Sequence, residues 1–106
     1  MLRLSIGLLA LLTFMQPAWS KPAQCFTTDD GYYNCDFRGI QGDGSFIISA
    51  PNRPTFTLYI DRPGVAYGVG DYGSGRPVNL PGVFYRSKQD GACWINYATT
   101  TTICAW

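Results

Sequence analysis

The stretch from Cys25 to Cys35 reads CFTTDDGYYNC and predicts a β-hairpin that is closed by its own disulfide. Two short runs rich in aromatic residues flank Asp29-Asp30-Gly31. A three-residue loop that ends in glycine is common in hairpins, because glycine adopts the left-handed conformation without strain. With that loop Cys25 lies opposite Cys35, within disulfide reach across the strand pair. The hairpin and the disulfide therefore predict each other.

The stretch from Cys93 to Cys104 repeats this pattern at the C-terminal end. The runs CWINY and TTTIC would pair around Ala98-Thr99, with Cys93 opposite Cys104. Alanine and threonine are poor formers of two-residue turns, which leaves room for a longer loop. Four cysteines allow three connectivities, and the sequence alone does not exclude the other two. We expect the local pairing, Cys25–Cys35 with Cys93–Cys104.

Between these hairpins, strand-like runs alternate with turn residues at intervals of about ten residues. In the run 55–61, Phe56, Leu58 and Ile60 share one face, which is typical of a half-buried strand. One face of the run 65–71 consists of alanine and glycine, which indicates a bulge, a barrel corner or close backbone contact. Further strands are expected at residues 45–49 and 83–86.

No helical periodicity follows Lys21, and the composition favours strands joined by tight turns. The predicted fold class is therefore all-β. We expect a small antiparallel barrel or sandwich of about seven or eight short strands, stapled by disulfides.

Residues 1–20 have the features of a cleaved signal peptide. A positive start at Arg3 precedes an apolar run that is shorter than the roughly 20 residues needed to cross a bilayer. Ala18-Trp19-Ser20 then places small residues where a signal peptidase cuts. The alternative, a retained membrane anchor, fits these flanks less well. We expect a single mature domain, 21–106, secreted or periplasmic, with no transmembrane segment after cleavage.

Charge and composition narrow the function. Without Arg3, seven basic residues balance seven aspartates, so neither nucleic acid nor an anionic membrane is an expected partner. Histidine is absent, and oxidised cysteines offer no nucleophile, so we expect neither an enzyme nor a cofactor. The N-terminal aspartates are assigned to turns, because their spacing matches no calcium loop.

Aromatic side chains are the clearest sign of a binding surface, because tyrosine combines an apolar face with a polar tip. About half of them should fill the core of the domain. Tyr59 and Tyr72 are expected to be exposed, and the glycine-rich loop 71–77 adds Ser74 and Arg76. The aromatics considered are Tyr32, Tyr33, Tyr59, Tyr67, Tyr72, Tyr85, Tyr97, Trp94 and Trp106.

Three Arg-Pro pairs stand in turns or at strand ends. Were these turns to cluster at one end of a barrel, their guanidinium groups could grip an anion. The simpler interpretation is that each arginine is solvated and held extended by the following proline. The pairs begin at Arg53, Arg62 and Arg76.

The segments YGSGR at 72–76 and VFYRSKQDGA at 83–92 resemble the signature stretch of bacterial c-type lysozyme inhibitors, which are small exported β-barrels. The resemblance implies that Ser74 and Lys88 enter the lysozyme cleft, where an ammonium group would pair with carboxylates. Three positions depart from the family pattern: Arg86 replaces a tryptophan, Gln89 replaces a glycine and Val78 replaces a tyrosine.

These observations rank three functions. The first is a non-catalytic binding or interaction protein of the cell envelope or exterior, whose partner is a protein or a glycan. The second is an inhibitor of lysozyme-type cell-wall hydrolases. The third is a structural envelope protein with no specific ligand. The expected binding residues are Tyr59, Tyr72, Ser74, Arg76 and Lys88, and the oligomeric state is not predicted.

Overall fold

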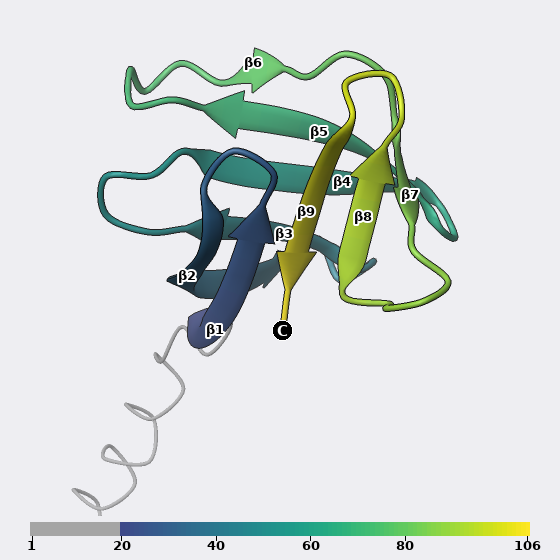
Figure 1. Ribbon diagram of the computed structural model, residues 1–106, viewed down its shortest axis with the longest axis horizontal. Helices are drawn as coiled ribbons and strands as arrows, with labels where there is room; N and C mark the ends of the chain where they lie inside the picture. Colours follow the sequence, from purple (N-terminus) through teal and green to yellow (C-terminus); the bar gives the residue numbers. More distant parts are fainter. Residues whose placement is uncertain (1–19) are drawn as a thin grey trace, which may run out of the picture.

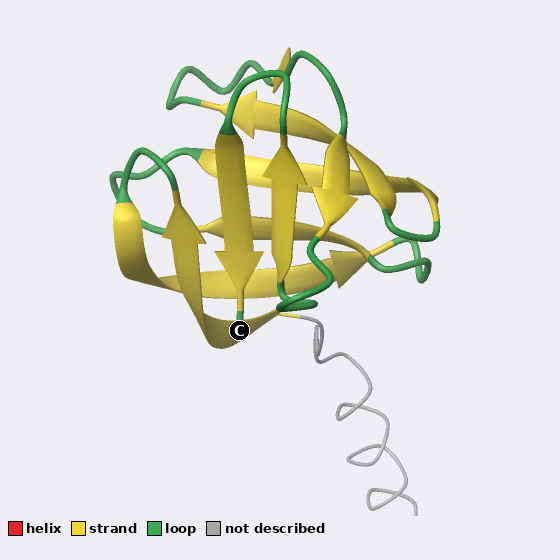
Figure 2. Ribbon diagram, turned by 45° about the vertical axis from the view of Figure 1, so that its right-hand side comes forward, coloured by secondary structure: helices red, strands yellow, loops and turns green. Residues whose placement is uncertain are grey.

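A computed structural model describes residues 20–106, so the predicted signal peptide lies, except for Ser20, outside the described residues. All regular structure within 20–106 is β, as predicted (Figure 2). No helix in this part of the chain is long and apolar enough to cross a membrane. The strands are β1 Ser20–Thr27, β2 Gly31–Ile40, β3 Ser45–Ser49, β4 Thr55–Arg62, β5 Val65–Asp71, β6 Val78–Asn79, β7 Phe84–Arg86, β8 Cys93–Asn96 and β9 Thr101–Ala105.

Eight of these strands close into an antiparallel barrel (Figure 1). Their order is β4-β3-β2-β1-β9-β8-β7-β5, and β5 pairs back onto β4 to complete the circle. The short strand β6 pairs with Val69 and Gly70 of β5, beyond the point where β7 pairs with Val65 and Ala66. The structure thus has the barrel of the two predicted architectures, with one additional strand.

Side chains from all eight strands of the barrel fill its interior. Phe56 and Leu58 of β4 point inward as predicted, and Ile60 packs against the same core. The glycine face of β5 also points inward, where a Cβ at Gly68 would lie only 2.6 Å from a ring carbon of the fully buried Phe84. The close backbone approach expected for residues 65–71 is therefore present.

The N-terminal hairpin forms the predicted disulfide but with a different register. Cys25 pairs with Tyr33, and Cys35 pairs with Ala23, so the cysteines are diagonal neighbours and not directly opposed. Their Cα atoms are nonetheless 5.9 Å apart. Strand twist shortens one diagonal of an antiparallel pair, which accounts for the bridge at this register. Gly31 has a φ of 72°, the left-handed conformation that the loop required.

The C-terminal hairpin follows the prediction more closely. Cys93 lies directly opposite Cys104 and bonds to it, and the connecting turn spans four residues, 97–100. Trp94 and Ile103 point into the core, so strand alternation places the adjacent cysteines on the other side of the sheet, where Cys104 is still buried at 3% exposure. One disulfide therefore lies in the barrel core, and the other joins β8 to β9 on the opposite side of the wall.

The up-and-down order places the turns alternately at two ends of the barrel. One end, called here the upper end, carries turns 28–30, 50–54, 72–77 and 97–100; the lower end carries turns 41–44, 63–64 and 87–92, with Arg62 at the end of β4 beside them. Arg53 and Arg76 consequently lie at the upper end and Arg62 at the lower end. Because the three arginines are divided between the two ends, they do not form a common anion site.

Candidate functional site

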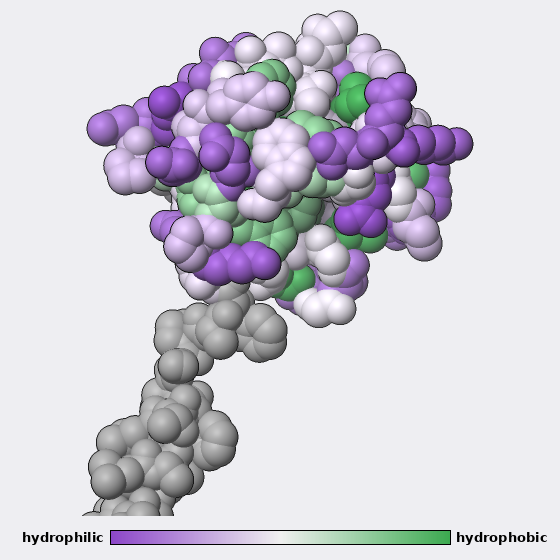
Figure 3. Space-filling view, turned by 60° about the horizontal axis from the view of Figure 1, so that its bottom comes forward, coloured by the Kyte–Doolittle hydropathy of each residue, from purple (hydrophilic) through white to green (hydrophobic). Residues whose placement is uncertain are grey.

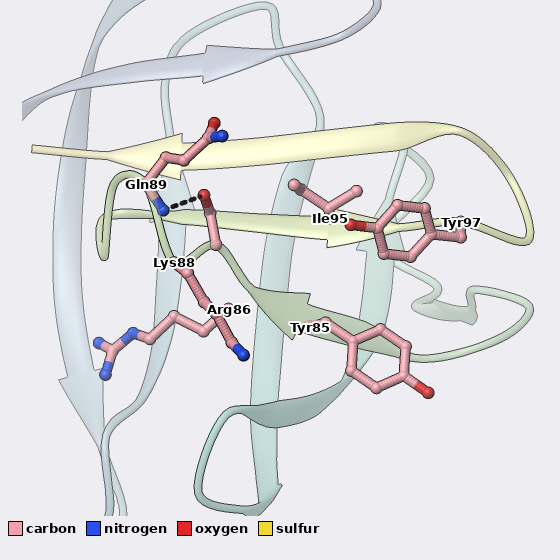
Figure 4. A pocket seen from close by; sticks show the side chains of 7 residues that line it. Tyr85, Arg86, Lys88, Gln89, Ile95 and Tyr97 are labelled. Atoms are coloured by element: carbon pink, nitrogen blue, oxygen red, sulfur yellow. Dashed lines mark hydrogen bonds between the residues drawn. The ribbon is translucent and has the colours of Figure 1, made fainter.

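The main candidate site is a groove on the outer wall, over β7 and β8. Phe84 and Trp94 are buried in the core, so strand alternation turns the next residues, Tyr85 and Ile95, outward. Tyr85 and Ile95 are register partners and form the floor of the groove. The groove has a volume of about 510 Å³ and is lined by Tyr85, Arg86, Ser87, Lys88, Gln89, Ile95 and Tyr97 (Figure 4).

Two tyrosines form an aromatic platform in this groove. The ring centroids of Tyr85 and Tyr97 are 6.1 Å apart, and the ring planes are inclined by 42°. Their exposed fractions are 44% and 70%, so both rings offer surface to a ligand. Inclined neighbouring rings with free hydroxyls suit a ligand that has both an apolar face and polar edges.

The other end of the groove is cationic. Arg86 is already engaged, because its Nε–H donates to the Gly91 carbonyl at 2.9 Å and its guanidinium lies 5.1 Å from the centre of the Trp94 ring. Lys88 forms no ion pair with any residue of the described chain. In Figure 4 the Lys88 ammonium lies on the side of Tyr85, whereas the Arg86 guanidinium points away from that ring. Lys88 is therefore the groove's available cation.

Short hydrogen bonds hold the loop that carries Lys88. The Ser87 hydroxyl oxygen accepts from the backbone N–H groups of Gln89 at 3.1 Å and of Asp90 at 3.3 Å. The Asp90 carboxylate accepts from the backbone of Ala92 and from the Trp106 indole, each at 2.9 Å. Those two bonds, the backbone one first, lower the pKa of Asp90 below its ordinary value. The backbone at Lys88 is thus positioned from both sides.

Beyond the groove, tyrosines continue across the barrel wall. Tyr59 of β4 and Tyr67 of β5 are register partners on the outer face, with exposed fractions of 38% and 51%. Tyr85 pairs with Val65, which lies two residues before Tyr67 on the same strand. We call Tyr59, Tyr67, Tyr85 and Tyr97 the tyrosine row; it crosses β4, β5 and β7 and ends just after β8.

Of the residues predicted to bind, three lie together at the upper end, away from the groove. Tyr72, Ser74 and Arg76 belong to the loop after β5, and all three are exposed. The Asp71 carboxylate organises this loop by accepting from the N–H groups of residues 73 and 75. The Tyr72 ring packs edge-on against Phe56, with centroids 6.0 Å apart.

Ser74 and Lys88 are not brought together. Ser74 follows β5 at the upper end, whereas Lys88 lies in the loop after β7 at the lower end, where the Arg86 N–H donates to the Gly64 carbonyl. The seven residues of β5 separate them, a length of about 20 Å. A single rim containing both side chains, which the resemblance implies, is absent from this structure.

Two other hollows are less specific. One, of about 400 Å³ at the lower end, is lined mostly by glycine and apolar residues, including Phe37 and Ile40. Figure 3 shows the face at the bottom of Figure 1, where apolar surface is bordered by hydrophilic side chains. The other, of about 250 Å³ at the upper end, lies between Asp29, Asp30 and Tyr72. In the described chain, no cluster of acidic or cysteine side chains suits a metal ion.

Comparisons of the chain with models of protein families, with curated proteins and with solved structures found no match. What the groove can bind is therefore argued from its own residues. From the sequence, Tyr67, Tyr85 and Tyr97 were predicted only as members of the general set of aromatics, and Ile95 was not predicted to take part. The alternation of inward Phe84 and Trp94 with outward neighbours is the signal that could have identified them.

Proposed function

We propose that this protein is a non-catalytic binding protein of the cell envelope or exterior, and that it binds through the groove over β7 and β8. The observation that carries the proposal is the Tyr85–Tyr97 platform next to an unpaired Lys88. Aromatic rings that stay exposed on a rigid wall are typical of binding surfaces. The two disulfides and the signal-like N-terminus support export, since disulfides persist in oxidising compartments.

The groove offers contacts but no reaction machinery. Its side chains provide aromatic faces, an ammonium group, a hydroxyl and an amide, and no histidine or carboxylate lines it. The Ser87 hydroxyl oxygen already accepts two backbone hydrogen bonds, and within residues 20–106 no hydrogen bond joins it to the Lys88 ammonium. Recognition without catalysis is therefore the function that these residues support best.

The alternative proposal, inhibition of a lysozyme-type hydrolase, is favoured by one observation. The Lys88 ammonium is free to enter a cleft lined by carboxylates, as the resemblance implies. With Ser74 about 20 Å away, however, an inhibitor of this kind would have to act through Lys88 and the neighbouring tyrosines alone.

The experiment measures co-sedimentation of the purified, oxidised protein with an envelope fraction of the producing cell. We expect retention that Tyr97→Ala and Lys88→Ala reduce. Tyr32→Ala is the matched control, because Tyr32 is equally exposed, at 68%, but lies on β2 beside Trp106. Equal retention of all variants contradicts the proposal and favours a structural role. A turbidity assay with c-type lysozyme tests the alternative, which requires inhibition that Lys88→Ala abolishes.

A further inference from the structure

We propose that the groove and the tyrosine row bind an acidic oligosaccharide, a chain of pyranose sugars that carries a carboxylate, lying across β8, β7, β5 and β4. This inference rests on the proposed function and names its ligand. It follows from three features of the wall: paired aromatic faces, the tyrosines on successive strands and the Lys88 ammonium beside them.

The aromatic pair suits the two-sided chemistry of a sugar. A pyranose ring has a face of C–H groups that packs on an aromatic ring and a circumference of hydroxyls that needs hydrogen bonds. Tyr85 and Tyr97 are inclined by 42° beside Ile95 of β8, and together they offer apolar surface for such a face. The two tyrosine hydroxyls and the exposed Gln89 amide, which lines the same groove, can bond to sugar hydroxyls.

The spacing of the row matches a linear sugar chain. Neighbouring strands lie about 4.8 Å apart, and a pyranose with its linking oxygen has about the same length. Tyr59 and Tyr67 are directly opposed on adjacent strands, and Tyr85 lies on the next strand along the wall. An oligosaccharide that crosses the strands would therefore meet tyrosines on successive strands of the wall.

The positive charge of Lys88 in the groove favours a sugar that carries a carboxylate. Lys88 is exposed and unpaired within the described chain, and no aspartate lines the groove. Arg86 also lines the groove, but its guanidinium lies over Trp94, donates through Nε to Gly91 and points away from Tyr85. Lys88 is thus the cation placed to meet a sugar carboxylate beside the tyrosines, whereas a polyphosphate or nucleic acid would need a basic stripe that this neutral domain lacks.

The test uses calorimetric titration of the oxidised protein with a 1,4-linked tetrasaccharide that carries one uronic acid and with the methyl ester of the same tetrasaccharide. We expect the acid to bind about two- to fivefold more tightly than the ester, the range for an exposed ion pair. Lys88→Gln should remove this difference and leave the affinity for the ester unchanged. Tyr97→Ala should weaken both ligands by at least about fivefold, as for a central aromatic contact.

Chain length tests the extended site. Tyr67→Ala should weaken binding of the tetramer but not of the dimer, because two sugars fill only the groove. Tyr32→Ala should change neither. Equal affinities for acid and ester in the wild type, or no binding of either, overturn the inference.

The same variants separate this inference from the proposal on which it depends. If neither tetramer binds while Tyr97→Ala still releases the protein from the envelope fraction, the groove is a binding site but its ligand is not this sugar. If retention also survives Tyr97→Ala, both proposals fail. Retention that persists after enzymatic removal of the envelope glycans identifies a protein partner and likewise overturns the inference.

Discussion

Replacing Gly68 with alanine should destabilise the barrel, although it adds only one methyl group. The new Cβ would lie 2.6 Å from Phe84 Cε1, far inside ordinary contact, and 3.1 Å from Leu80 Cδ1, a few tenths of an ångström inside it. Phe84 is fully buried, so its ring can move only if the surrounding core moves with it. Overpacking of this kind costs about 1–3 kcal/mol. Alanine offsets about 0.4–1 kcal/mol of that cost by restricting the unfolded chain, so we expect a net loss of about 1–2 kcal/mol.

The assay is urea unfolding of the oxidised protein, followed by tryptophan fluorescence. A domain of this size should also melt about 5–15 °C lower. Gly39→Ala is the matched control, since Gly39 also lies in a strand, but a Cβ there meets nothing within 4 Å. It should be neutral or slightly stabilising.

A double-mutant cycle identifies the contact. Phe84→Leu in the Gly68→Ala background should recover part of the loss, with a coupling of about 0.5–3 kcal/mol. Stability of Gly68→Ala equal to that of Gly39→Ala, or strictly additive effects with Phe84→Leu, would refute the close packing of β5 against β7.

Three further predictions concern polar groups. Asn96 is fully buried, donates to the Pro81 carbonyl at 2.8 Å and accepts from two N–H groups of the following turn; Asn96→Ala should lower the free energy of unfolding by about 2–4 kcal/mol in urea titration, and a loss below 1 kcal/mol would contradict these bonds. The Tyr33 hydroxyl is buried without a hydrogen-bond partner in the described chain, so Tyr33→Phe should leave stability unchanged or raise it by about 1 kcal/mol, whereas a clear loss would reveal a partner. The folded-state pKa of Asp90 lies below its unfolded value of about 3.9; its contribution is therefore complete above that pH and is lost as the pH falls through the folded pKa. Asp90→Asn should flatten this part of the acid unfolding curve, and an Asp90→Asn curve parallel to the wild type would exclude a role for the Trp106 hydrogen bond.

The sequence predicted the elements of this fold better than their partners. The alternation of Phe56 and Leu58 identified both the strand and its buried face, because a half-buried strand has a period of two. The sequence did not decide between a barrel and a sandwich, because closure depends on pairs that are distant in sequence, such as Phe26 with Cys104. The register of the first hairpin also differed from expectation, since a disulfide tolerates either a direct or a diagonal pair.

The candidate site was less predictable, for a related reason. Tyr59 and Tyr72 are exposed as expected, because each follows a local pattern of strand or loop. The contact of Tyr85 with Tyr97, in contrast, exists only because β7 pairs with β8 in one particular register. Ser74 and Lys88 are close in sequence, yet Ser74 lies in the loop at the upper end of β5 and Lys88 lies in the loop beside its lower end. Local patterns thus predict exposure, whereas proximity requires the strand order.

The loop 72–77 and the groove over β7 and β8 also differ in how tightly each should bind a ligand. In the loop 72–77 the Tyr72 ring packs on Phe56 and the Asp71 carboxylate holds the backbone, but a ligand would still have to order the exposed side chains of Ser74 and Arg76. Tyr85, in contrast, directly follows the fully buried Phe84 on β7, and the buried Asn96 holds the turn that carries Tyr97 through two hydrogen bonds. Immobilising a free side chain costs about 0.5–1.5 kcal/mol on binding. The side chains of the wall are already more ordered in the folded protein, so less of this entropy remains to be lost when a ligand binds. The groove is therefore the better-preorganised surface, and substitutions there should cost more affinity than substitutions in the loop.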